Sequence, residues 1–387
     1  VESIGKSPFT VELIKKKKQK KNPAPPFTTS SLQQEAYRKL NFAAKKTMRI
    51  AQQLYEGVEL SKKEGSIGLI TYMRTDSVRI SDEAKNEALK YIEATFGKEY
   101  LPEKPRNYER KGKAQDAHEA IRPTSILRDP NTIKSYLSND QYKLYKLIWE
   151  RFLASQFASA VLEVTSVDLR VNDYLFKATG TVVVFPGYTK VYVESKDEQD
   201  KDEQGVLPEL EEKEEVYLEK LLPKQHFTQP SPRYTEASLI KTLEEKGIGR
   251  PSTYAPILDT IVSRGYVVKE KKQYVPTELG FLVVELLKKY FQEIIDVEFT
   301  ANLENMLDSI AEGKSDWKKV LLLFFEPFQQ ELKIADKEIG QIEIADEVTE
   351  EVCENCGRNL VIKQGRFGKF LACPGFTDCR NTKPLLK

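Results

Sequence analysis

The sequence lacks several features that would assign it to a special class of protein. No apolar run approaches the ~20 residues that cross a membrane, and we recognise no signal peptide. Cysteine is absent before Cys353, which excludes a disulfide framework through most of the chain and favours a reducing compartment such as the cytoplasm. The formal net charge is +1, so overall charge gives no push toward nucleic acid and any such site must be a local patch.

What is present fits a globular protein of several domains. The chain has 387 residues, of which 31% are charged and 40% hydrophobic, so we expect two to four domains. It begins at Val1 rather than Met, and we expect that an upstream segment was removed. Lysines 15–18, 20 and 21 form one local basic patch, for which a solvated strand end or loop is the alternative interpretation.

The first 158 residues alternate between helical and extended patterns. They predict, in order, a strand at 8–19, a proline-rich boundary at 22–26, a helix from 32 to 55 with a break near Asn41, a strand at 68–73, a helix between Ser81 and Gly97, and a helix at 139–158. Ser81 suits an N-cap, and Gly97 suits the residue that ends a helix.

The pattern changes after residue 160. Residues 162–193 are rich in Val, Thr, Tyr and Phe and predict several strands with a turn at 185–188. Residues 195–215 are acidic and predict an exposed loop. This loop contains Asp200-Lys201-Asp202, which looks like a paired-carboxylate metal site but has no apolar frame to hold it. A strand is expected at 216–222, and mostly helices from 235 to 340.

Tyr72 lies in Gly-Leu-Ile-Thr-Tyr-Met-Arg-Thr-Asp-Ser, residues 68–77. In the predicted strand, Tyr72 and Arg74 point to the same face. A free phenol has a pKa near ~10 and is a weak nucleophile at neutral pH. A neighbouring guanidinium favours a phenolate and can hold a phosphate oxygen, so the pair is suited to attack on phosphorus. The alternative is packing, which is the role of most of the 18 tyrosines.

A second informative segment is Glu-Lys-Gly-Ile-Gly-Arg-Pro-Ser-Thr-Tyr, residues 245–254. Its glycines allow close approach of a ligand, and Pro251 suits the first position of a helix with Ser252 and Thr253 in the first turn. Helix N-termini bind phosphate, and Arg250 adds a fork of donors. The following residues predict a winged-helix unit, with a plain helix-turn-helix connection as the alternative. Arg264 is a weaker candidate for the same surface.

Residues 115–124, Gln-Asp-Ala-His-Glu-Ala-Ile-Arg-Pro-Thr, contain one of only two histidines. The segment fails the zinc-protease pattern, because Arg122 stands where the second histidine would be. On a helical turn, His118 and Arg122 would share a face suited to a phosphate. The alternative is an ordinary surface histidine.

The four cysteines all lie near the end of the chain, as Cys353-x-x-Cys356 followed by Cys373 and Cys379. Four thiolates suit tetrahedral Zn²⁺, although the wider second pair leaves disulfides open as an alternative. Between the pairs, charge and aromatic rings interleave in a way that suits base stacking, or else simply covers a small core. These residues are Arg366, Phe367, Lys369 and Phe370.

Three of these segments resemble one known family. Residues 68–77 resemble the active-site segment of type IA DNA topoisomerases, and Met73 is more similar to bacterial topoisomerase I than to topoisomerase III. The Ala-His-Glu-Ala-Ile-Arg-Pro and Gly-Ile-Gly-Arg-Pro-Ser-Thr strings are also similar to that family. The resemblance runs from Phe27 through the tail, whose ribbon is common in bacterial topoisomerase I.

The resemblance implies a multidomain α+β fold, in which helical domains with winged-helix-like units and a β-rich arch form a torus, followed by a zinc ribbon. The implied parts are an arch strand and linker at 1–28, the catalytic-tyrosine domain at 29–158, the β-rich arch or hinge at 159–228, a helical DNA-binding domain at 229–344 and the four-cysteine zinc ribbon at 345–387.

The resemblance also implies an ATP-independent activity that relaxes negative supercoils. Tyr72, assisted by Arg74, cuts one strand of single-stranded or underwound DNA and becomes linked to its 5′-phosphate. The expected DNA contacts are His118, Arg122, Arg250, Ser252, Thr253 and, more weakly, Arg264. We expect a monomer that binds no membrane and holds Zn²⁺ through Cys353, Cys356, Cys373 and Cys379.

One departure from the family matters. Its members carry an N-terminal Toprim domain whose acidic cluster holds Mg²⁺, and we find no counterpart in these 387 residues. We therefore expect a fragment that binds DNA but is catalytically incomplete, with Mg²⁺ needed only when that domain is present. The alternatives are a non-catalytic protein that binds single-stranded DNA, topoisomerase III, or the topoisomerase half of reverse gyrase.

Overall fold

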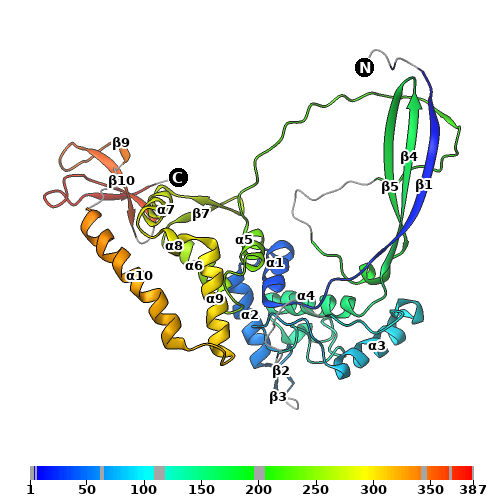
Figure 1. The fold of residues 1–387 in the computed structure, drawn as a ribbon, viewed down its shortest axis with the longest axis horizontal. Helices are drawn as coiled ribbons and strands as arrows, with labels where there is room; N and C mark the ends of the chain where they lie inside the picture. The colour runs from blue at the N-terminus through cyan, green and yellow to red at the C-terminus, as the bar shows by residue number, and fades with distance from the viewer. Residues whose placement is uncertain are drawn as a thin grey trace. The chain divides into compact units, whose positions relative to one another are not determined.

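The computed structural model describes residues 4, 7–61, 65–108, 118–195, 205–340, 347–365 and 368–385 (Figure 1). The chain divides into two compact units. The first comprises Val1–Gly280 with Asp296–Ala311, and the second comprises Phe281–Ile295 with Glu312–Lys387. Within the described ranges, no helix is both long enough and apolar enough to cross a membrane.

Four helices build the part of the first unit that carries Tyr72. They are α1 (Thr29–Leu40), α2 (Ala44–Glu56), α3 (Asp82–Phe96) and α4 (Asn139–Ser155). The predicted break is confirmed, because Asn41 ends α1 with a φ of 56°. The predicted caps of α3 are also confirmed: the Ser81 hydroxyl accepts from Ala84 N–H, and Gly97 ends the helix with a φ of 105°.

These helices enclose a large apolar core. Its largest fully buried side chains include Phe27, Leu54, Tyr145 and Phe152. The hairpin of β2 (Val58–Ser61) and β3 (Gly65–Ile67) follows α2 and leads into the Tyr72 segment. Short 3-10 turns lie at Lys98–Tyr100 and Lys134–Tyr136.

The predicted strand at 68–73 is wrong. The segment makes one isolated bridge, Ile70 to Pro123, and otherwise follows an irregular path. Leu69, Ile70 and Met73 are all buried in the core. Beyond Ile70 the Thr29 hydroxyl at the start of α1, and not a neighbouring strand, binds the Met73 carbonyl, so the strand pairing does not continue.

The β-rich part is a four-stranded sheet in the order β5-β4-β1-β6. Three long strands lie side by side, namely β1 (Phe9–Lys21), β4 (Ala160–Val171) and β5 (Tyr174–Phe185) (Figure 1). β1 pairs antiparallel with β4, so residues distant in sequence form one sheet. The hairpin between β4 and β5 turns at Asn172, with a φ of 51°.

Two predictions around this sheet change and a third is confirmed in part. The turn expected at 185–188 is the end of β5 followed by a short 3-10 helix, Gly187–Lys190. The strand expected at 216–222 shrinks to β6 (Glu215–Val216). The acidic loop is confirmed for its described residues 205–214, which form no helix or strand, whereas Asp200-Lys201-Asp202 lies outside the described residues.

The predicted winged-helix arrangement is confirmed. It consists of α5 (Glu236–Glu245), α6 (Tyr254–Ser263), β7 (Val267–Glu270) and β8 (Gln273–Pro276). Ile240, Leu258 and Tyr274 form its small core together with Ala44 of α2, so this unit packs directly on the tyrosine part. α5 also contacts α1 (Figure 1). The helix α9 (Val297–Ala311) belongs to the same compact unit.

The second unit is helical and then β-stranded. Its elements are most of α7 (Glu278–Tyr290), α8 (Gln292–Ile295), α10 (Trp317–Glu338), β9 (Glu347–Val352), β10 (Asn359–Gly365), β11 (Gly368–Ala372) and β12 (Thr382–Pro384). The strands form one antiparallel sheet in the order β12-β11-β10-β9. Phe291 packs against Phe328 of α10, with ring centroids 6.0 Å apart.

The buried side chain of Arg151 joins two of the chain segments that connect the sheet to the tyrosine part. Its Nε donates to the Pro25 carbonyl at 2.7 Å, and its Nη1 lies 2.9 Å from Glu194 Oε1. Its guanidinium also lies over the rings of Phe27 and Tyr192, 4.9 Å and 5.3 Å from their centroids. Only 4% of the Arg151 side chain is exposed, so its contacts with Pro25 and the two rings are shielded from water, whereas the Glu194 side chain is 53% exposed.

We predict that Arg151→Met lowers the free energy of unfolding of this region by about 3 kcal/mol, because two charge-assisted hydrogen bonds are lost. The first thermal unfolding transition and the rate of proteolysis at residues 22–26 and 193–195 measure the effect. Arg49→Met, at an exposed position of α2, is the matched control. Equal stability of the two variants contradicts the prediction.

Candidate functional site

Tyr72 lies in an irregular loop, half-buried between two other aromatic rings. Its ring centroid is 5.4 Å from that of Tyr55, in a T-shaped contact. It is also 5.4 Å from the His118 ring, at an interplanar angle of 35°. The structure therefore places Tyr72 and His118 together. Tyr55, which the sequence did not single out, completes the group from the end of α2.

The first turn of α1 holds the loop that follows Tyr72. Thr29 Oγ1 lies 2.8 Å from the Met73 carbonyl and accepts from Thr75 N–H at 2.9 Å. Thr29 N–H donates to the Thr75 carbonyl at 2.8 Å. These contacts are buried, so they fix the backbone on the C-terminal side of Tyr72 and leave Arg74 exposed.

Residues 118–124 are extended, so the expected helical turn shared by His118 and Arg122 is wrong. The segment bridges Phe27 through Ile121 and Ile70 through Pro123. A residue that precedes proline is disfavoured in the helical region, which explains the extended backbone at Arg122. Residues 115–117 of the same string lie outside the described residues.

The Arg122 guanidinium forms an ion pair with the Glu119 carboxylate. Its Nη2 and Nε lie 2.7 Å and 2.8 Å from Glu119 Oε2, and 13% of its side chain is exposed. Its carbonyl accepts from Thr71 N–H at 2.9 Å, directly before Tyr72. Arg122 therefore supports the backbone beneath Tyr72 and is not a free cation on the surface.

Arg74 and Ser252 line the same pocket, which has a volume of about 290 Å³. The pocket lies between the Tyr72 loop, α2 and α6, and Met48, Lys45 and Asp259 also line it. Lys45 pairs with Asp259 at 2.8 Å. Among the described residues, no ion pair engages Arg74. The pocket therefore combines an unpaired guanidinium with a serine hydroxyl.

The loop before α6 differs from the expected helix start. α6 begins at Tyr254, so Pro251 and Ser252 lie in a preceding turn and Thr253 is the N-cap. Thr253 Oγ1 accepts from Arg250 N–H at 2.8 Å, which occupies the hydroxyl within the turn. Gly249 has a φ of 80°, and a Cβ atom there would lie 3.2 Å from the Tyr254 ring, so the position favours glycine.

Arg250 points toward α9 and pairs with two carboxylates. Its Nη2 lies 2.7 Å from Asp308 Oδ2, and its Nη1 lies 3.7 Å from Glu304 Oε2. Burial opposes the charge, but the carboxylates outweigh it and raise the pKa of Arg250. Nothing in the sequence identified these α9 partners. Arg264 is exposed at the opposite end of α6, about 15 Å along the helix from its start.

The four cysteines form one cluster whose sulfur atoms all lie within 4.8 Å of one another. The Sγ–Sγ distances are 3.6 Å for Cys353–Cys379 and 3.3 Å for Cys356–Cys373, and all four are free thiols. A tetrahedron with Zn–S bonds of ~2.3 Å has edges of about 3.8 Å, so the cluster fits Zn²⁺. Asn381 Nδ2 donates to Cys353 Sγ, a typical contact around a metal ligand.

The base-stacking role suggested for the aromatic and basic residues between the cysteine pairs remains a prediction. Arg366 and Phe367 lie outside the described residues, as does the side chain of Lys369. Phe370 is half-buried in β11.

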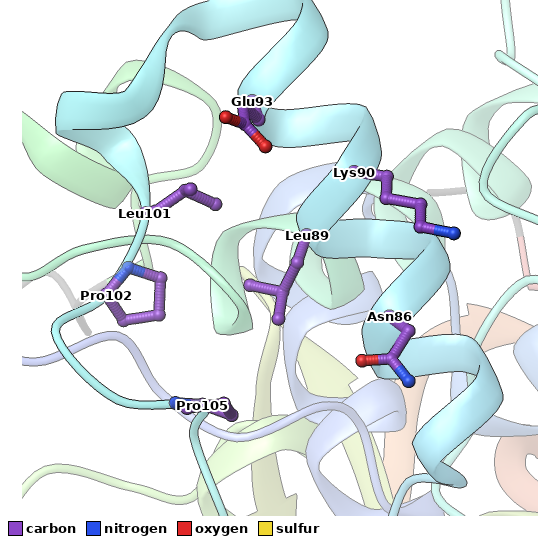
Figure 2. Close-up of a pocket in the computed structure, with 7 residues that line it drawn as sticks. All are labelled: Asn86, Leu89, Lys90, Glu93, Leu101, Pro102 and Pro105. Atoms are coloured by element: carbon purple, nitrogen blue, oxygen red, sulfur yellow. The ribbon is translucent and has the colours of Figure 1, made fainter.

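A second pocket of about 300 Å³ lies on α3. Leu89 of α3 faces Leu101, Pro102 and Pro105 of the following loop (Figure 2). None of the predicted site residues lines this pocket. We therefore assign the candidate site to the Tyr72 loop and the pocket beside it.

Comparisons with known proteins identify families and a solved structure that this chain matches. A protein-family model described as DNA topoisomerase matches residues 1–322, and one described as a topoisomerase DNA-binding C4 zinc finger matches residues 350–387. The chain is similar to the full-length topoisomerase I of Thermotoga maritima, with 39% sequence identity and a TM-score of 0.75. The match covers 100% of this chain and 61% of the Thermotoga chain.

We predict that Cys373→Ser reduces bound zinc from about one equivalent to below about a tenth, because three thiolates and a hydroxyl bind Zn²⁺ much more weakly. Metal analysis of purified protein measures the content. As a control, Asp378→Asn changes an exposed residue between Cys373 and Cys379, and this variant should retain the metal. Full zinc retention in Cys373→Ser contradicts the assignment.

Proposed function

The chain belongs to the bacterial type IA topoisomerase family, and on that premise we propose that it is an ATP-independent DNA topoisomerase in which Tyr72 cleaves and reseals one DNA strand. The proposed partner is single-stranded or underwound DNA, bound by a monomer. The multidomain α+β fold and the C-terminal zinc ribbon agree with this family.

The proposed reaction is a reversible transesterification. The Tyr72 hydroxyl oxygen attacks a backbone phosphorus, and the bond from phosphorus to the 3′ oxygen breaks. The phenol gives up its proton and the leaving 3′ oxygen takes one up, so a 5′-phosphotyrosine and a free 3′-hydroxyl result. The second strand passes through the gap, and the same hydroxyl reverses the attack. One phosphodiester replaces another at each step, so the cycle needs no ATP.

The observation that carries the proposal is the meeting of three distant segments around Tyr72. His118 contacts the Tyr72 ring, the 118–124 segment hydrogen-bonds to Thr71, and Arg74 shares a pocket with Ser252. A guanidinium and a hydroxyl beside the nucleophile suit a phosphodiester and the charge that develops on it. We propose that Arg74, His118 and Ser252 contact the cleaved strand.

We give different roles to the paired arginines. Arg122 is proposed to position the backbone under Tyr72 through Glu119, because its guanidinium is already bound. Arg250 is proposed to contact a DNA phosphate after exchanging its carboxylate partners on α9. Thr253 is proposed to shape this loop through its bond to Arg250 N–H, and exposed Arg264 to make a peripheral backbone contact.

The family's activity also uses Mg²⁺ held by carboxylates. Among the described residues, the one group of three or more potential ligands that lie close enough to hold a metal ion is the cysteine cluster. The chain spans 61% of the Thermotoga protein that it matches. We propose that these 387 residues bind DNA by themselves but do not relax supercoils unless the acidic metal site is supplied.

We predict that Tyr72→Phe abolishes covalent attachment to DNA, because the phenol oxygen is the proposed nucleophile. A single strand labelled at its 3′ end is incubated with Mg²⁺ and protein expressed from the complete reading frame, then denatured and separated by size. The labelled fragment should migrate with the wild-type protein and with Tyr55→Phe, the same change in the neighbouring ring.

An adduct that persists in Tyr72→Phe refutes Tyr72 as the nucleophile. Absence of any adduct, together with tight binding of single strands, would favour the alternative of a non-catalytic DNA-binding protein. That alternative would explain the winged-helix unit and the zinc ribbon without requiring Tyr72.

We predict that Asp308→Asn tightens binding of single-stranded DNA by about threefold to tenfold at low salt, because it frees Arg250 for a phosphate. Fluorescence anisotropy with a labelled single strand measures the affinity. Glu298→Gln makes the same charge change at an exposed position of α9 and should alter affinity less than twofold. Weaker binding by Asp308→Asn would show that the ion pair serves only to hold the loop.

A further inference from the structure

The strand β1 carries six lysines in its last seven residues, Lys15 to Lys21, and all seven residues are exposed. β4 covers one edge of this stretch. On the other edge, β6 pairs only with Phe9 and Thr10, and a Glu212 carboxylate oxygen accepts from Ile14 N–H. Beyond Ile14 the outer edge pairs with no described strand. Lysines are a common way to prevent such an edge from pairing with another chain.

The two faces of this strand differ in their surroundings. Lys16, Lys18 and Lys20 share one face, because side chains alternate along a strand. Across the pair with β4, Lys18 lies opposite Glu163. Lys20 Nζ bonds to Glu103 Oε1 at 2.9 Å. Two of the three lysines on this face therefore have a carboxylate nearby.

The opposite face carries Lys15, Lys17 and Lys21, and three neighbouring residues on it have hydroxyl groups. In register with these lysines lie Ser166, Val164 and Ala160 of β4, and beyond them Thr179 and Thr181 of β5. No carboxylate of β1, β4 or β5 lies on this face between Lys15 and Lys21. The next one, Asp168, lies opposite Leu13 and within 3.8 Å of Lys177.

We propose that this Lys15/Lys17/Lys21 face binds the sugar-phosphate backbone of double-stranded DNA, as a second DNA site apart from the Tyr72 pocket. Lysine ammonium groups and serine or threonine hydroxyls are common phosphate contacts that carry no sequence information. The inference rests on the proposed function in one respect, that DNA is the substrate.

The composition of the face selects duplex over single-stranded DNA. Proteins that bind single strands stack bases on aromatic rings. No aromatic side chain of β1, β4 or β5 lies on this face between Lys15 and Lys21, where the neighbours are Leu162, Val164, Thr179, Thr181 and Val183. Seven strand residues span about 20 Å, the length of about six base pairs. If the lysines served only to keep the edge of β1 from pairing with another strand, there would be no reason for one face to lack carboxylates.

The test compares two triple variants with equal loss of charge. One replaces Lys15, Lys17 and Lys21 with Gln, and its control replaces Lys16, Lys18 and Lys20 with Gln. Binding of a labelled duplex of about 20 base pairs by the 387-residue chain is measured by anisotropy over a series of salt concentrations. The first variant should lose about tenfold in affinity and reduce the salt slope by about 2 to 3, at ~0.9 per phosphate contact. The control should change affinity by less than about threefold.

Equal losses in both variants would show a net-charge effect, and no loss in either would leave edge protection as the role of the lysines. Each result overturns the proposal. Thermal unfolding checks that both variants fold, and replacing Lys15, Lys17 and Lys21 with Arg should restore binding because the charges return.

A second readout separates this proposal from the proposed function. Covalent capture of a single strand by Tyr72, in protein expressed from the complete reading frame, should be unchanged in both lysine variants. Loss of duplex binding with capture intact supports the second site. Absence of capture in every variant, with the face-specific loss retained, would refute the function of Tyr72 and leave the duplex site standing.

Discussion

The contacts of Arg151 are the constraint on which the arrangement of the first unit depends. The chain passes between the β sheet and the tyrosine part near Pro25, between α4 and β4, and again near Glu194, and one buried guanidinium binds the first and last of these segments. Tyr192 donates to Glu35 at 2.5 Å beside it. Burial, and then the Glu35 carboxylate, raise the pKa of Tyr192, so its hydroxyl keeps the proton that it donates. A buried charge with few bonding arrangements favours one relative placement of these segments.

The first of these segments also organises the candidate site. Within five residues, the Pro25 carbonyl accepts from Arg151, the Phe27 carbonyl accepts from Ile121 N–H at 2.8 Å, and Thr29 binds the loop after Tyr72. The same stretch of backbone therefore contacts Arg151, the His118 segment and the Tyr72 loop in turn. A displacement of the sheet that pulled on residues 25–29 would be transmitted to the Tyr72 loop through hydrogen bonds rather than through loose packing.

Local chemistry allowed much of this fold to be predicted from the sequence. The helix between Ser81 and Gly97, the break at Asn41 and the cysteine cluster all depend on residues close together in sequence. The failures share another cause. The 68–73 segment makes only one bridge because Thr29, more than forty residues earlier in the chain, binds the backbone that follows it. Pro123 and pairing with distant residues keep 118–122 extended. The partners of Arg250 lie more than fifty residues away, and no spacing rule identifies them.

Because the net charge is only +1, binding of a polyanion such as DNA must depend on local groups of cations. Two of the arginines that the sequence suggested for phosphate already have carboxylate partners, as Arg122 has Glu119 and Arg250 has Asp308. A phosphate that reaches Arg250 must replace a carboxylate of similar strength, so the net gain is small and depends on salt. At Arg74 and on the Lys15/Lys17/Lys21 face, a phosphate displaces only water and counterions. Affinity should therefore arise mainly where cations lack partners, whereas the paired arginines serve geometry until DNA supplies a better ligand.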